Sequence, residues 1–131
     1  MSIGLVRITL YERQNGRCPA DDFLHSMERK MRKKFEGQFY ALGQRGSDYC
    51  NQQRFWPLSG EGKPLWEFKE HDHRLYCFRK LTDRAQKSIT VVLFGGWIKD
   101  KKGKTEEEKR KIETAMNIYN EFSQEYPGFQ G

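Results

Sequence analysis

Three short strand-like segments follow one another along the chain, and the short links between them constrain the fold more than any other feature. They are LWEFK, RLYCF and SITVVLF, at residues 65–69, 74–78 and 88–94. The first alternates, with Trp66 and Phe68 on one face and Glu67 and Lys69 on the other, and the last is apolar enough to be central. Because residues 70–73 and a charged loop at residues 79–87 are short links, we expect an antiparallel meander.

Strand and helix patterns precede this meander. Residues 4–12 (GLVRITLYE) are β-branched and apolar, which predicts a first strand. From Pro19 onward, apolar residues recur at helical spacing, and this predicts one long helix or two short ones meeting near Gly37. Gly43 and Gly46 are expected to end the helical segment.

A last helix is predicted after the meander. The spacing from Thr105 to Glu108 is that of a capping box, and Pro127 ends the helical pattern. Its apolar stripe consists of Ile112, Ala115, Met116, Tyr119 and Phe122. The order of these elements over residues 1–131 predicts a single α+β domain with an N-terminal strand, one or two helices, an antiparallel sheet and a C-terminal helix.

Charge and cysteine usage limit the classes of function. Lysine and arginine number 24 against 18 acids, a net charge of +6 that favours polyanion binding but also suits an ordinary basic protein. Cys18, Cys50 and Cys77 are widely spaced and odd in number, which argues against a disulfide framework and a zinc site. Without a long apolar run or a signal-peptide pattern, the sequence predicts a cytoplasmic protein with no membrane partner.

Cations gather at one place in the predicted topology. Lys69 and Arg74 lie on adjacent strands joined by a tight turn. A lysine-rich segment then precedes a helix N-terminus, whose free N–H groups favour anions. Its members are Lys99, Lys101, Lys102 and Lys104. Trp97 and Tyr76 are candidate stacking surfaces for unpaired bases. The alternatives are a solvated loop, a cross-strand pair of Arg74 with Glu67, and core aromatic rings.

Several short motifs occur in order along nearly the whole chain. They are residues 16–19 (GRCP) with Phe23, then 57–60 (PLSG), 65–69 (LWEFK), 73–76 (HRLY), 93–99 (LFGGWIK) and 104–105 (KT), with Ala115 in the last predicted helix. Together they resemble the RelE/HigB-type toxins of type II toxin–antitoxin systems, in the phage-derived HigB-like branch. The resemblance implies a RelE-like fold.

The resemblance also implies a function. Such a toxin is a ribosome-dependent mRNA endoribonuclease, or mRNA interferase, that inhibits growth until a cognate antitoxin, typically of helix-turn-helix type, neutralises it in a hetero-oligomer. The substrate 2′-OH attacks the adjacent phosphate, and neither a metal nor another cofactor is needed. By position, Arg74 is the implied phosphate-binding arginine, Lys69 a weaker cation for RNA, and Lys99 the first lysine of the family's pair.

The sequence departs from the family pattern where protons must move. Asp100 replaces the second lysine of the pair, and no tyrosine follows the lysine loop to act as a base. His71 and His73, in the turn beside Arg74, are the nearby side chains whose ordinary pKa suits proton transfer, so we name them as candidate catalytic residues together with Arg74 and Lys99. The rival hypothesis is a non-catalytic RNA- or antitoxin-binding module of the same fold.

Overall fold

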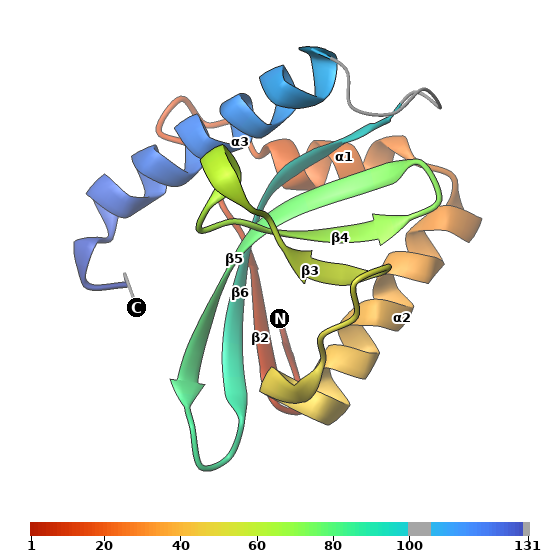
Figure 1. The fold of residues 1–131 in the computed structure, drawn as a ribbon, viewed down its shortest axis with the longest axis vertical. Coiled ribbons are helices and arrows are strands. Elements are labelled where there is room, and N and C mark those ends of the chain that lie inside the picture. The colour runs from red at the N-terminus through yellow and green to blue at the C-terminus, as the bar shows by residue number, and fades with distance from the viewer. Residues whose placement is uncertain (100–105, 130–131) are drawn as a thin grey trace.

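The computed structural model describes residues 1–99 and 106–129 and contains a six-stranded sheet with helices on both faces (Figure 1). The strands are β1 (Ser2–Ile3), β2 (Val6–Leu10), β3 (Phe55–Pro57), β4 (Trp66–Glu70), β5 (His73–Asp83) and β6 (Ser88–Ile98). The helices are α1 (Pro19–Ser26), α2 (Arg29–Arg45) and α3 (Glu106–Glu125), with 3-10 turns η1 (Gly46–Asp48), η2 (Gly60–Gly62) and η3 (Pro127–Phe129). The predicted α+β class, with its N-terminal strand, two helices, sheet and C-terminal helix, is confirmed.

The sheet has the order β1-β2-β6-β5-β4-β3 and is mixed. Strands β3 to β6 pair antiparallel in sequence order, which confirms the predicted meander. Strand β2, however, pairs parallel with β6, so that Val6 lies opposite Ile89. The long connection through α1 and α2 makes this possible, because parallel neighbours need a crossover that a tight turn cannot supply.

Two strand predictions needed correction. The ladder between β5 and β6 runs from His73 opposite Ile98 to Asp83 opposite Ser88, so the predicted charged loop at residues 79–87 is wrong over its first half. Polar residues are accommodated there because backbone pairing holds the strand, and the Arg79 guanidinium lies 4.8 Å from the centre of the Trp66 ring. Strands β1 and β3 were not predicted, since two or three residues show no periodicity.

The helical segment breaks at Met27 and Glu28 rather than near Gly37, which lies inside α2. Both residues of the break have extended backbone conformations. The Arg32 side chain donates hydrogen bonds to the carbonyl oxygens of Leu24 (3.0 Å) and Met27 (3.3 Å), and so satisfies backbone acceptors left free at the end of α1. A side chain one turn into α2 therefore stabilises the break.

The sheet separates two apolar cores. Helices α1 and α2 cover one face through Phe23, Phe35, Phe39 and Leu42. Helix α3 covers the other face through its predicted stripe, of which Ala115 and Phe122 are buried and Ile112, Met116 and Tyr119 partly buried. At Gly96 a Cβ atom would lie 2.1 Å from the Arg74 carbonyl oxygen and 2.7 Å from the Phe23 ring, so glycine allows α1 to approach the sheet.

Helix α3 does not cover its whole face of the sheet. It packs against β5, β6 and η2, while β3 and the adjoining part of β4 lie beside it (Figure 1). Among the described residues, no helix combines the length and the apolar composition that crossing a bilayer requires. The open part of the α3 face, next to the turn between β4 and β5, carries the candidate site.

Candidate functional site

Four charged side chains gather where the end of β4, the start of β5 and the end of β6 meet the first turn of α3. The Arg74 Nε atom lies 3.8 Å from Oε1 of Glu67, and the Lys99 Nζ atom lies 3.1 Å from Oε2 of Glu108. All four side chains are mostly enclosed but reach solvent, with exposed fractions between 11 and 20%. We call these four residues the charged cluster.

The pairing register places the cluster on one face of the sheet. Lys69 lies opposite Arg74, which in turn lies opposite Trp97, while Glu67 lies opposite Tyr76. Because side chains alternate along a strand and directly paired residues share a face, all five point to the side that α3 covers. The alternation predicted for residues 65–69 is thus confirmed, and it brings Glu67 and Arg74 together.

The turn between β4 and β5 fixes the Arg74 guanidinium. Its Nη1 atom donates to the carbonyl oxygens of His71 (2.6 Å) and His73 (3.0 Å). His71 adopts a left-handed backbone conformation, with φ of 53°, which allows the tight turn. The Lys99 backbone N–H donates to the carbonyl of Asp72 in the same turn (2.6 Å). The same turn therefore holds the Arg74 guanidinium and the backbone of Lys99, as pre-organised binding of an anion requires.

Burial raises the pKa of the Glu67 carboxyl above its usual value. Lys69 and Arg74 oppose this shift, Glu108 adds to it, and Lys99 opposes it again. A carboxylate with a raised pKa is a stronger base than an ordinary glutamate, which suits it to accept a proton. From the sequence, Glu67 is expected only as the cross-strand partner of Arg74; the signal for a further role is its position among cations on a strand face.

Trp97 and Tyr76 lie beneath the cluster rather than on its surface. The Trp97 Nε1–H donates to the Tyr76 hydroxyl oxygen (2.9 Å), and the two residues are only 6% and 2% exposed. Burial raises the pKa of Tyr76, so its hydroxyl stays protonated at neutral pH. The prediction that these rings stack on bases is therefore corrected: both are almost fully buried, in the core between the sheet and α3.

The two histidines predicted as catalytic point away from the cluster. The His73 ring lies on the opposite face of the sheet, 6.0 Å from the Phe23 ring and 6.5 Å from the Phe35 ring. The His71 side chain turns toward α2, where its Nε2 atom lies 2.8 Å from Lys34 Nζ. The structure thus brings Arg74 and Lys99 to one site, and neither imidazole lies there. For His73 the reason is that successive residues of a strand face opposite ways.

Of the other predicted cations, Lys69 is the one that lies within residues 1–99 and 106–129. Lys69 lies on the face of the cluster, and its Nζ atom donates to the Gln52 carbonyl (2.7 Å). Lys101, Lys102 and Lys104, together with Asp100 and Thr105, lie outside the described residues. Within residues 1–99 and 106–129, no three histidine, cysteine, aspartate or glutamate side chains are grouped so that they could hold a metal ion.

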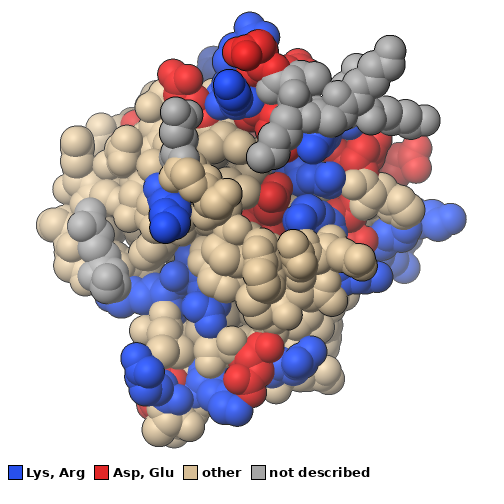
Figure 2. Space-filling view, viewed as in Figure 1, with Lys and Arg blue, Asp and Glu red and all other residues tan. Residues whose placement is uncertain are grey.

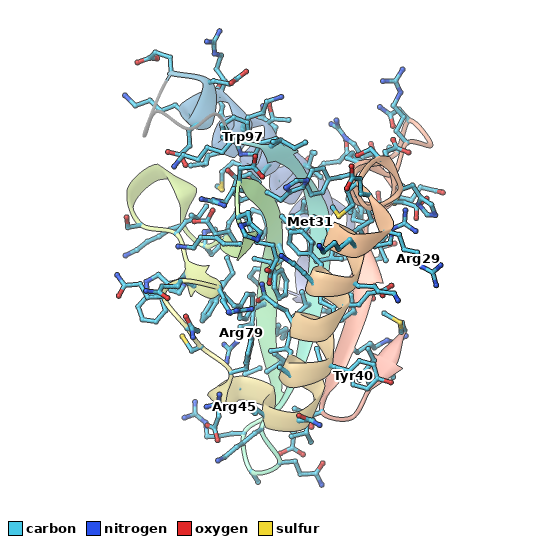
Figure 3. All side chains as sticks on the ribbon, turned by 90° about the vertical axis from the view of Figure 1, so that its right-hand side faces the viewer. Arg29, Met31, Tyr40, Arg45, Arg79 and Trp97 are labelled. Carbon is cyan, nitrogen blue, oxygen red and sulfur yellow. The ribbon has the colours of Figure 1, made fainter. Side chains whose placement is uncertain are left out.

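A second polar network lies on the opposite face of the same hairpin. The Gln38 amide donates to Oε2 of Glu70 (2.7 Å), and the Tyr49 hydroxyl donates to Oε1 of Gln38 (3.0 Å). Arg54 approaches the same Glu70 oxygen to 3.4 Å. Figure 3 looks onto α2, which covers this face of the sheet. This network ties α2 and the residues after it to the edge of the sheet.

No family model matches the chain, and no curated protein matches it either. The crystal structure of the toxin–antitoxin complex RelBE2 from Mycobacterium tuberculosis matches with a TM-score of 0.45 and 17% sequence identity, covering 76% of this chain and 100% of that chain. With a TM-score below 0.5, this likeness does not assign a family.

Proposed function

We propose that this chain is a RelE/HigB-type toxin of a type II toxin–antitoxin system, acting as an mRNA endoribonuclease on the ribosome. The observation that carries the proposal is the pairing of Glu67, whose pKa is raised, with Arg74, whose guanidinium the hairpin turn holds in place. Arg74 also occupies the position that the sequence resemblance gives to the phosphate-binding arginine.

The cluster supplies the groups that RNA cleavage by an internal nucleophile needs. Glu67 accepts the proton of the substrate 2′-OH, and the 2′ oxygen then attacks the adjacent phosphorus. The bond to the 5′ oxygen breaks, leaving a 2′,3′-cyclic phosphate and a 5′-OH that takes its proton from water. Arg74 and Lys99 stabilise the charge that develops on the phosphorane-like transition state. Glu67 thus replaces the histidines as the proposed base.

The proposal includes partners. We infer that a cognate antitoxin, of the helix-turn-helix type, covers the cations of the cluster in a toxin–antitoxin hetero-oligomer, and that both act in the cytoplasm. The net charge of +6 suits association with mRNA and ribosomal RNA, because cations release counterions from a phosphate backbone. We propose that Lys69 contacts a flanking phosphate, and its position opposite Arg74 on the same face supports this.

Induced expression in a bacterial host without antitoxin tests the proposal. Wild-type protein should arrest growth and leave new 5′ ends at codon-phased positions in cellular mRNA. Arg74→Ala should lower cleavage on the order of 10²- to 10³-fold, since it removes one charge-stabilising donor. Arg54→Ala is the matched control, because Arg54 lies on the opposite face. Unchanged growth and intact mRNA with folded wild-type protein would refute the enzyme and favour a non-catalytic module.

A further inference from the structure

A tryptophan with an exposed ring stands next to the charged cluster. Trp56 in β3 is 39% exposed, whereas Trp97 is buried and Trp66 packs against the core beneath α2. An indole that reaches solvent offers a large, rigid aromatic surface with which a ligand can pack. Trp56 is not among the residues predicted from the sequence, because the three-residue strand that carries it shows no periodicity.

The pairing of β3 with β4 fixes the face on which Trp56 stands. Phe55, one residue earlier, is fully buried on the α2 side, where its ring stacks on Phe68 at 4.3 Å between centroids. Since side chains alternate, Trp56 lies on the opposite face, where its Cα partner in β4 is Glu67. Figure 2 shows an uncharged patch near the middle of the surface in view, bordered by acidic and basic side chains.

Arg74 and Trp56 flank Glu67 from two sides. Arg74 reaches toward Glu67 from β5, with 3.8 Å between Nε and Oε1, and Trp56 stands beside it on β3. Directly opposite residues of an antiparallel pair have Cβ atoms about 5 Å apart. A nucleotide with its phosphate at Arg74 can therefore place the neighbouring base over the indole without leaving this face.

We propose that Trp56 is a base-stacking residue, and that its indole holds a nucleobase next to the phosphate bound at Arg74. This inference rests on the proposed function, because it assigns a subsite for the same RNA. Lys69 and Arg74, farther along the same face of the sheet, favour a nucleic acid over an apolar partner segment. Pro57 removes a backbone donor from this edge strand, which disfavours strand addition. Because every base has a π-face, the subsite adds affinity with little sequence preference.

Tryptophan fluorescence tests the stacking directly. The probe is a single-stranded oligoribonucleotide with 2′-O-methyl groups, which the protein cannot cleave because the 2′ nucleophile is blocked. Wild-type emission should be quenched on titration, and Trp56→Phe should remove most of the quenching, since Trp97 is buried and Trp66 is partly buried on the opposite face of the sheet. In anisotropy measurements with labelled RNA, Trp56→Ala should weaken binding by roughly 10- to 100-fold, whereas Trp56→Phe keeps most of the affinity.

Tyr40→Ala is the matched control, because Tyr40 is an exposed aromatic residue (65%) on α2, away from the cluster, and its loss should leave binding unchanged. Thermal unfolding of each variant checks that the fold is intact. In ribosome cleavage assays, Trp56→Ala should raise KM and change kcat little.

Two outcomes would overturn the inference. One is RNA binding without a change in emission and with equal affinity for Trp56→Ala; if Arg74→Ala still abolishes cleavage, the proposed function survives and only the stacking fails. The other is protection of Trp56 by an antitoxin peptide but not by RNA, which would make the ring a protein contact. If wild-type protein neither binds nor cleaves RNA, both proposals fail together.

Discussion

The two faces of the β4–β5 hairpin each carry a glutamate from β4, and their surroundings differ. Glu70, on the α2 side, accepts a hydrogen bond of 2.7 Å from Gln38 and has Arg54 at 3.4 Å. Glu67, on the α3 side, has Arg74 no closer than 3.8 Å. Burial raises the pKa of Glu67.

The difference separates a structural carboxylate from a reactive one. A buried carboxylate whose acceptor sites are filled contributes to stability, and removing it leaves partners unsatisfied. A carboxylate that is enclosed but loosely paired gains less from its charge, and so takes up a proton more readily. The same strand thus serves the fold on one face and, in our proposal, the chemistry on the other.

The largest expected effect is on catalysis by Glu67→Gln. This nearly isosteric change removes the proposed base, so single-turnover cleavage of ribosome-bound mRNA should slow by roughly 10²- to 10⁴-fold. Glu70→Gln and His71→Ala on the α2 side are the controls and should stay close to the wild-type rate. Equal reductions of the cleavage rate in Glu67→Gln and Glu70→Gln would contradict the proposed difference between the two faces.

For the free energy of unfolding, the larger effect is expected at Glu70 rather than at Glu67. Glu70→Ala leaves the Gln38 amide without its acceptor and should lower the free energy of unfolding by about 1–3 kcal/mol, as measured by urea denaturation. Glu67→Gln should not be less stable than wild type at neutral pH, since it removes a carboxylate whose charged form burial disfavours. A larger loss of stability for Glu67→Gln than for Glu70→Ala would contradict this assignment.

A smaller effect is expected on the pH dependence of cleavage when other charges of the cluster are removed. If Glu67 acts as the base, cleavage falls as pH drops through its pKa, and the acid limb of the pH–rate profile lies above the ordinary glutamate range. Glu108 raises the pKa of Glu67 and Lys99 lowers it, so Glu108→Gln should move the limb to lower pH and Lys99→Ala to higher pH. Shifts in the same direction, or no limb in wild type, would count against Glu67 as the base.

Much of the fold was predictable because its patterns are local. The alternation of residues 65–69 gave the faces of β4, and the apolar stripe after Glu108 gave the face of α3. The position of Arg74 on a strand also followed from local pattern. The break at Met27 did not, since it depends on contacts that the Arg32 side chain makes with α1.

The candidate site was predictable only in part. The sequence by itself determined which cations lie on the paired strands and that Glu67 and Lys69 share a face, because a strand has a fixed period of two. Only the tertiary structure decided that α3 buries Trp97, that the His73 ring faces the helical core and that Trp56 is exposed beside Glu67. Cross-strand register and helix packing join residues far apart in the chain, so no local pattern contains them.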